Sequence, residues 1–222
     1  MKPLLSVKEL GCPDGLETDL QGWHSQDPVF AALIKEVQPK AIIEVGTWKG
    51  ASALHMAQLT GPTTDAVMPI LDTVMGIPIY CVDTWMGGID HMLHEDEPNQ
   101  NSDFMRFHGY PQVYFQFLHN VMQSPHAHRI YPIPNTSACA ARLLLEHKII
   151  ADLIYIDGDH TYEGCFSDLC HYWHLLRPGG VIFGDDFGDF ISIQHATQRF
   201  VYEYNLKMEV VTNTFWTIKK PA

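Results

Sequence analysis

The sequence predicts a single α/β domain with a doubly wound, mostly parallel seven-stranded sheet, helices on both faces and an antiparallel strand at the C-terminal end. Short apolar runs alternate with longer helical patterns throughout the 222 residues. The runs are almost continuous in Val, Ile and Leu, which is typical of parallel strands buried on both faces. A chain of this length buries roughly 70% of its unfolded surface, so it can form a full core without a disulfide or a metal.

Each predicted strand is a short apolar run that ends at a polar residue or a glycine. The parallel strands are expected at Ala41–Val45, Ile79–Val82, Ile130–Ile133, Leu153–Ile156 and Val181–Phe183. A hairpin-like pair, Met208–Val211 and Thr214–Ile218, is expected at the end of the chain. Helical periodicity predicts helices at about Pro28–Val37, Ala51–Leu59, Val113–Met122, Ala138–His147, Glu163–Leu176 and Ile193–Tyr204.

Residues 1–222 are interpreted as one domain, in which residues 1–37 form an N-terminal helical extension. Gly61–Pro78 contains three prolines and is expected to be a surface elaboration, with room for only a short helix near Asp65–Met75. Residues 87–111 form a long polar segment at the carboxyl edge, where open α/β sheets bind ligands. We expect a substrate lid there, and a surface excursion without a role in binding is the alternative.

The charge balance argues against polyanionic partners. The chain has 14 Lys and Arg against 26 Asp and Glu, a net charge of −12, so neither nucleic acid nor an anionic membrane is an expected partner. The N-terminal residues lack the apolar core of a signal peptide, so we expect a cytoplasmic protein. The five cysteines form no CxxC pair and are expected to be reduced. The apolar content of the N-terminal extension favours a homodimer.

A glycine-containing loop joins the first strand to the following helix, with the sequence Glu44-Val45-Gly46-Thr47-Trp48-Lys49-Gly50-Ala51-Ser52. Its backbone N–H groups gather at a helix N-terminus, which suits the loop to an anionic group. Gly46 permits a tight turn and Gly50 a close approach, and turn geometry alone is the alternative role for both. The spacing differs from the GxGxxG and GxxxxGK[ST] loops, so a smaller ligand with a carboxylate is expected.

Asp83 and Trp85 follow the second predicted strand. An acidic side chain at this position can accept hydrogen bonds from two ribose hydroxyls. Trp85 can lie against an adenine ring. The alternatives are a helix or turn cap for Asp83 and a core aromatic for Trp85.

Carboxylates follow two further strands of the predicted sheet. Asp157 ends one strand, and Asp185 and Asp186 end the next. Adjacent parallel strands lie about 4.8 Å apart, so the three side chains can converge. Three converging carboxylates repel one another unless a cation lies between them, and oxygen ligands favour Mg²⁺, with Mn²⁺ or Ca²⁺ as alternatives. Ordinary turn-forming strand ends are the other interpretation.

His160 lies three residues after Asp157 and can face the same cavity. Neutral imidazole is a good general base near pH 7, and a metal would lower the pKa of the hydroxyl that it deprotonates. Asp159 is expected to cap the following helix rather than orient His160. Ordinary surface exposure is the alternative for His160.

Together these segments resemble the class I S-adenosylmethionine-dependent methyltransferases, and within them the metal-dependent O-methyltransferases. The resemblance covers about residues 38–219 and is anchored at Glu44–Ser52, Val82–Trp85, Ile156–Tyr162 and Leu176–Asp186. Within that group the sequence is similar to macrocin-type sugar O-methyltransferases and to cephalosporin-biosynthesis methyltransferase-like proteins. The resemblance implies a Rossmann-like methyltransferase fold, S-adenosylmethionine as the cofactor and a small-molecule hydroxyl acceptor.

The resemblance also implies which residues bind the cofactor. These are Glu44, Gly46, Thr47, Gly50, Ser52, Asp83, Trp85, Ser137 and Asp157. The loop residues Gly46, Thr47 and Ser52 would contact the methionine portion. Ser137 lies in a short polar segment beside adenine, where family members usually have an acidic residue at the position of Thr136.

The metal ligands and the base are implied in the same way. Asp157, Asp185 and Asp186 match the metal ligands of the family, and His160 matches its general base. Catechol-type relatives have Lys at the His160 position and Asn at the Asp186 position, so the chain is more similar to the sugar and natural-product branch. The implied reaction is an in-line transfer of the sulfonium methyl group to an oxygen of a vicinal diol or a similar bidentate acceptor.

Two other classes of function are alternatives. One is a protein that binds the nucleoside cofactor or a metal without catalysis, for which a base beside a metal has no use. The other is a metal-dependent hydrolase, which leaves Glu44–Ser52 and Asp83 without a purpose.

Overall fold

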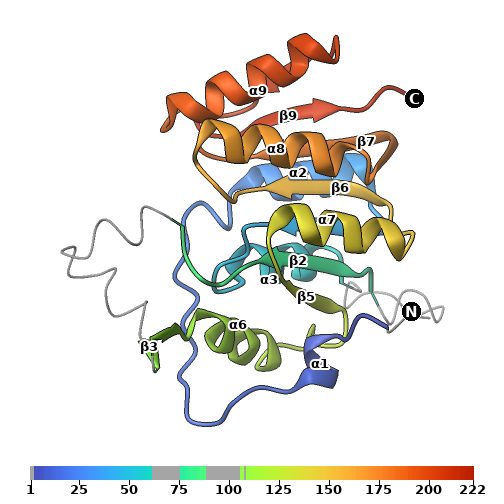
Figure 1. Ribbon diagram of the computed structural model, residues 1–222. Helices are drawn as coiled ribbons and strands as arrows, with labels where there is room; N and C mark the ends of the chain where they lie inside the picture. The colour runs from blue at the N-terminus through green and yellow to red at the C-terminus, as the bar shows by residue number, and fades with distance from the viewer. Residues whose placement is uncertain (1–2, 62–75, 89–105, 108) are drawn as a thin grey trace, which may run out of the picture.

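A seven-stranded sheet forms the centre of the molecule, with the strand order β5-β2-β1-β6-β7-β9-β8 (Figure 1). The computed structural model describes residues 3–61, 76–88, 106–107 and 109–222. The strands are β1 (Ile42–Val45), β2 (Ile79–Asp83), β5 (Ile130–Pro134), β6 (Ala151–Ile156), β7 (Leu176–Gly184), β8 (Met208–Val210) and β9 (Trp216–Lys219). The first five are parallel, and β9 pairs antiparallel with both β7 and β8. The predicted doubly wound sheet with an antiparallel C-terminal strand is confirmed.

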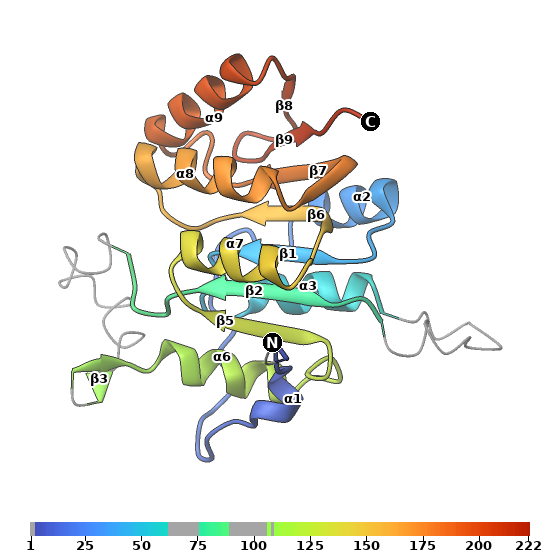
Figure 2. The same cartoon turned by 45° about the vertical axis from the view of Figure 1, so that its right-hand side comes forward.

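Helices cover both faces of the sheet (Figure 2). One face carries α2 (Pro28–Val37), α3 (Ala51–Leu59) and α6 (Val113–Met122), and the other carries α7 (Ser137–Glu146), α8 (Tyr162–Trp173) and α9 (Ile191–Glu203). Successive strand residues point to opposite faces. Ile42 therefore belongs to the core cluster that contains Phe30 of α2, whereas Ile43 belongs to the cluster that contains Phe200 of α9.

The helix boundaries follow from local capping. Asp27 accepts a hydrogen bond from the Val29 amide at 2.8 Å, and Pro28 occupies the first turn, where its missing N–H costs nothing. Thr161 caps α8 by accepting from the Gly164 amide at 3.1 Å. The cap at Asp27 and the proline that follows it explain why α2 begins at the predicted residue.

The structure differs from the sequence prediction around residue 176. The helix α8 ends at Trp173 rather than Leu176, because Leu176 already pairs with Ala151 at the start of β7. The strand continues through residues 178–180, where the backbone of Gly179 and Gly180 bonds to Lys220. Pairing with neighbouring strands, rather than local sequence, thus sets the beginning of β7.

Some short elements were not predicted. The helix α1 (Val7–Leu10) packs beside α6, and β3 (Arg106–Phe107) pairs with β4 (Tyr110–Pro111). The predicted helix near Asp65–Met75 and most of the predicted lid at 87–111 lie outside the described residues. None of the described helices has the length and apolar character needed to cross a bilayer.

The carboxyl ends of the parallel strands lie along one edge of the sheet, and the chain between α1 and α2 crosses this edge (Figure 1). Within the described residues 3–37, the N-terminal extension is helical only at α1 and α2. The segment between them passes from α6 towards the end of β7, and so lies over the region in which the candidate site residues were expected.

Candidate active site

The glycine loop after β1 lies directly against the end of β6. Gly46 has φ +85°, and a Cβ at this position would lie 1.8 Å from the carbonyl oxygen of Asp157. No side chain fits there, so glycine is required both for the backbone conformation and for the contact. The contact brings the candidate cofactor loop and the candidate metal ligand Asp157 to one place.

Asp83 holds the amide groups of the glycine loop. Its Oδ2 accepts from the amides of Thr47 at 3.0 Å and Trp48 at 2.9 Å, and its Oδ1 accepts from the Trp85 amide at 2.7 Å. The capping alternative therefore fits the position of Asp83. A contact to ribose hydroxyls stays a prediction, and the carboxylate lies beside the loop where such a contact would be made.

Trp85 is a core residue in this structure, with 2% of its surface exposed. Its ring packs against Tyr114 and Phe117 at centroid distances of 4.8 and 4.9 Å, and its Nε1 donates to the Trp48 carbonyl at 2.7 Å. The core-aromatic alternative fits this environment better than a stacking surface for adenine. Through its hydrogen bond to the Trp48 carbonyl, Trp85 supports the backbone of the glycine loop.

Glu44 at the end of β1 and Ser52 in the first turn of α3 are both buried. Glu44 is fully buried and accepts from Ser52 Oγ at 2.5 Å. Burial raises the pKa of Glu44 to about 7, against the opposing effect of the hydroxyls nearby. Thr47 is also buried, and its Oγ1 has no partner in hydrogen-bonding geometry within the described part of the chain.

Ser137 begins α7 and is held by a carboxylate from α8. Its Oγ donates to Asp168, and its carbonyl accepts from the Tyr172 hydroxyl at 3.1 Å. Burial raises the pKa of Asp168 to about 6. Asp168 has no signal in the sequence that distinguishes it from other helical acids, so this buried partner of Ser137 was missed.

Asp157, His160 and Asp186 converge at the ends of β6 and β7. Each offers one ligand atom, and these atoms lie within 4.8 Å of one another. His160 Nε2 is 3.0 Å from Asp186 Oδ2. A cavity of about 10 Å³, roughly the room of one water-sized sphere, lies among these residues and Asp185. The group suits a hard divalent cation because two of its ligands are carboxylates.

Burial and the neighbouring acidic groups together raise the pKa of Asp157. Loss of hydration, followed by the charges of Asp186 and Asp185, raises the pKa of Asp157 to about 8. The buried Tyr155 hydroxyl donates to Asp157 Oδ2 at 2.9 Å and opposes this rise. Such repulsion is what a cation at this position would relieve.

Asp185 is turned towards the N-terminal extension. Its Oδ2 lies 2.9 Å from Nδ1 of His24, and its Oδ1 accepts from the Asp186 amide at 2.8 Å. Burial opposes the protonation of His24, but the hydrogen bond and charge of Asp185 raise the pKa of His24 overall. The sequence analysis missed His24, because nothing local links it to a residue 161 positions away. Metal ligation by Asp185 stays a prediction.

His160 is positioned by its neighbours on the chain and on α9. Its carbonyl accepts from Ser192 Oγ at 2.5 Å, and its ring lies 4.5 Å from that of Phe190. Asp159 Oδ1 accepts from the Thr161 amide at 2.8 Å, next to the start of α8. The N-cap of α8 is Thr161, so the expectation that Asp159 caps this helix was wrong, and Asp159 instead binds the amide of the cap residue.

Comparison with known proteins identifies the class. Residues 43–187 match the family model of the methyltransferase domain, and this match spans more than half of the chain. The chain therefore belongs to the methyltransferase domain family, as the resemblance in the sequence predicted. A comparison with curated proteins finds no match to the sequence.

Solved structures of methyltransferases share the fold. An O-methyltransferase from Bacillus cereus in complex with SAH aligns with TM-score 0.57 and 13% identity, over 92% of this chain and 84% of that chain. CalS11, a TDP-rhamnose 3'-O-methyltransferase of calicheamicin biosynthesis, aligns with TM-score 0.59 and 18% identity, over 86% and 77%. The O-methyltransferase NovP aligns with TM-score 0.59 and 11% identity, over 89% and 80%. At these identities the similarity establishes the Rossmann-like methyltransferase fold.

Proposed function

We propose that this methyltransferase transfers the methyl group of S-adenosylmethionine to a hydroxyl of a small molecule with neighbouring oxygens, such as a sugar or natural-product diol, with help from a divalent metal. The observation that carries the proposal is the contact of Gly46 with the backbone of Asp157. It supports the proposal because the loop expected to hold the methionine portion lies beside a carboxylate expected to bind the metal that orients the acceptor.

The residues around the loop fit the cofactor. Gly50, in the αL conformation, ends the loop and is the N-cap residue of α3. The buried hydroxyl of Thr47 can donate a hydrogen bond to a ligand or to Glu44. Asp83 lies next to the loop for the ribose, and Ser137 lies at the start of α7 for the adenine. The O-methyltransferase from Bacillus cereus that shares the fold is in complex with SAH, which supports a cofactor of this kind.

The acidic group at the ends of β6 and β7 fits a divalent cation. Asp157 and Asp186 are within reach of one ion, and the pKa of Asp157 is raised first by burial and then by the charges of Asp186 and Asp185. Mg²⁺ is proposed, with Mn²⁺ or Ca²⁺ as alternatives. A cation bound there would orient two neighbouring acceptor oxygens and make the hydroxyl more acidic.

His160 is proposed as the general base. Its Nε2 lies 3.0 Å from Asp186 Oδ2, so a proton taken up by the imidazole is stabilised by a carboxylate. The glycine loop and the acidic group would hold the methyl donor and acceptor oxygen in line, which lowers the entropic cost of reaching the transition state.

The test is calorimetric titration of S-adenosylmethionine into metal-free protein, followed by assay of SAH formation with Mg²⁺ and a panel of acceptors. We expect micromolar binding, transfer to vicinal diols, and weak transfer to matched compounds with one of the two hydroxyls removed. EDTA should abolish transfer but not cofactor binding.

Each part of the proposal has its own contrary result. Absence of cofactor binding would contradict methyl transfer from S-adenosylmethionine. Equal rates with EDTA would contradict metal assistance, and equal rates on diols and single hydroxyls would contradict bidentate acceptors. Release of a hydrolysis product without SAH would favour the metal-dependent hydrolase.

A further inference from the structure

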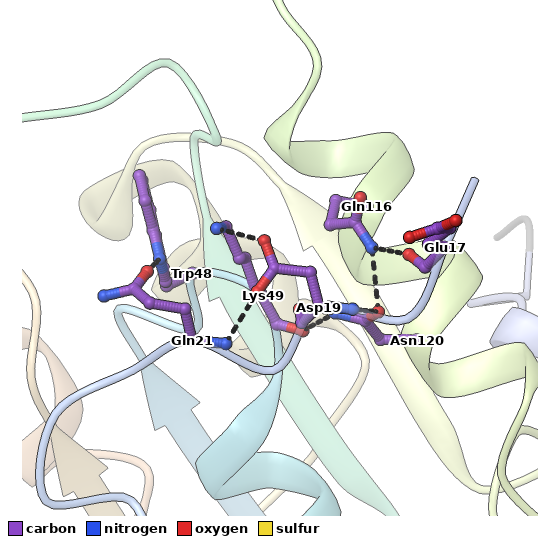
Figure 3. Close-up of polar contacts among 7 residues, drawn as sticks. All are labelled: Glu17, Asp19, Gln21, Trp48, Lys49, Gln116 and Asn120. Atoms are coloured by element: carbon purple, nitrogen blue, oxygen red, sulfur yellow. Dashed lines mark hydrogen bonds and ion pairs between the residues drawn. The ribbon is translucent and has the colours of Figure 1, made fainter. Parts of the chain in front are cut away.

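A segment of the N-terminal extension lies across the glycine loop, and we call residues 17–24 the strap. It passes over the carboxyl edge of the sheet (Figure 1) and contacts α6, the glycine loop and the end of β7 in turn, and Figure 3 shows the first two of these contacts. Gln116 of α6 donates to the Glu17 carbonyl at 2.8 Å. The strap then reaches the glycine loop, and at its far end His24 lies 2.9 Å from Asp185.

Asn120 of α6 connects the strap to the loop. Its Nδ2 donates to the carbonyls of Asp19 and Lys49 at 2.5 and 2.9 Å, and its Oδ1 accepts from the Asp19 amide at 3.0 Å. One buried side chain thus binds the backbone of two segments that are far apart in the sequence. Removing such a bridge leaves several buried polar groups to be rehydrated.

An ion pair between Lys49 and Asp19 also joins the glycine loop to the strap. Lys49 belongs to the glycine loop and is 2% exposed, and its Nζ lies 2.6 Å from Asp19 Oδ2 (Figure 3). Burying an ammonium group is costly unless it is paired and hydrogen-bonded. Asp19 supplies such a pairing from the strap, so its carboxylate helps to hold Lys49 and the backbone of the loop in place.

The strap also holds the residue next to Lys49. Trp48 is a non-glycine residue with φ +49°, and its Nε1 donates to Gln21 Oε1 at 2.9 Å. Such a backbone conformation persists only where the surroundings enforce it. Asp83 binds the Trp48 amide from the sheet side, so the loop is fixed from two directions.

We propose that the strap holds the glycine loop in the conformation that binds the cofactor, with Asp19 as a positioning residue acting through Lys49. This proposal rests on the proposed function, because it assigns the loop to cofactor binding. Asp19 touches neither the acidic group nor the loop amides. Its effect on the cofactor is indirect, through the ion pair and Asn120.

The test measures binding of SAH to full-length variants by calorimetry, well below their unfolding temperatures. Asp19→Asn keeps the backbone contacts and removes the charge beside Lys49. We expect it to raise the Kd for SAH about tenfold or more, the loss typical of a charge-assisted hydrogen bond. Asp19→Glu should recover most of the affinity, which a loss of general stability would not explain.

Glu17→Gln is the matched control. It removes the same charge from the same segment, but only the Glu17 carbonyl takes part in the contacts of the strap. We expect its Kd to stay within about twofold of the original. Hydrogen exchange of the amides at 47–50 supplies a second readout without ligand, and Asp19→Asn should speed this exchange more than Glu17→Gln.

The outcomes separate this proposal from the proposed function. If the unmodified protein does not bind SAH, both fail. If it binds SAH and Asp19→Asn matches Glu17→Gln in Kd and in exchange, the proposal for Asp19 alone is overturned. If Asp19→Asn does not fold, Gln21→Ala, which removes the acceptor of the Trp48 indole, must weaken SAH binding for the proposal to stand.

Discussion

Glu44 is a buried carboxyl whose protonation affects stability. It is fully buried, and its pKa is raised from 4.5 to about 7. Between these values the unfolded chain loses the proton while the folded chain keeps it, so the free energy of unfolding falls as pH rises. Above about pH 7 the loss is complete and amounts to about 3 kcal/mol.

Glu44→Gln should remove this pH dependence. Measured by urea unfolding, the free energy of unfolding of the variant relative to the unmodified protein should be about 2.5 kcal/mol higher at pH 8 than at pH 5. Glu146→Gln, at an exposed residue of α7, is the control and should show no such gain. An equal response of the two variants would mean that Glu44 ionises as readily in the folded protein as in the unfolded chain.

His160→Ala separates catalysis from binding. If His160 is the base, methyl transfer should fall by at least about two orders of magnitude while the affinity for SAH stays the same. The measurement is SAH formation under saturating cofactor and Mg²⁺. An unchanged rate would remove His160 from the mechanism, and a parallel loss of Mg²⁺ affinity would make it a ligand instead.

At the scale of elements, the site depends on how closely β1 and β6 approach at their ends. The strands pair in register from Ile42 with Leu153 to Val45 with Ile156, and the next residue of each strand forms the Gly46–Asp157 contact. A strand slipped by one residue would invert its faces and separate this pair. Sheet register therefore places the two halves of the site together.

Gly46→Ala tests this approach. The added Cβ would meet the Asp157 carbonyl at 1.8 Å, so we expect a loss of stability well above the roughly 1 kcal/mol of an unfavourable φ alone, together with loss of SAH binding. Gly15→Ala is the matched control, since Gly15 has φ +83° and no atom within 4 Å of the added Cβ. Thermal unfolding and SAH titration of both variants check the prediction, which fails if they behave alike.

Secondary structure was predictable where pattern and capping agree. The bounds of α2, α3 and α6 match the prediction because each has an apolar face of helical period and a polar or glycine boundary. The start of β7 did not match, because pairing with β6 extends it through Pro178. Elements as short as α1 and β3 contain too few residues for a period to be detected.

At the scale of the whole molecule, the net charge of −12 and the acidic group at the sheet edge both favour the binding of a cation. A cation bound between Asp157 and Asp186 should stabilise the folded protein. At about 100 times its Kd the gain is about 2.7 kcal/mol, or roughly 5–10 °C in Tm for a chain of this size.

Thermal unfolding with added Mg²⁺, at ionic strength matched with NaCl, measures this gain. Asp157→Asn should raise the Tm without metal, because it relieves repulsion, and should abolish the response to Mg²⁺. Asp14→Asn removes the same charge from an exposed position and should keep the response. A response that survives in Asp157→Asn would place the cation elsewhere.

The homodimer stays a prediction. Exposed apolar side chains on α9 and the edge strand β8, among them Ile191, Tyr202 and Val210, offer a surface for a second copy. Light scattering at micromolar concentration should then give twice the 25.2 kDa of the chain. A mass of one chain would contradict this expectation.

The sequence by itself determined the sheet, most helices, the glycine loop and the acidic strand ends. These features are encoded locally, by apolar periods and by residues at the ends of strands. Only the tertiary structure decided that Trp85 is a core residue, that His24 faces Asp185 and that Asp19 pairs with Lys49. Each of these contacts joins residues at least 30 positions apart, and no local pattern specifies such a pairing.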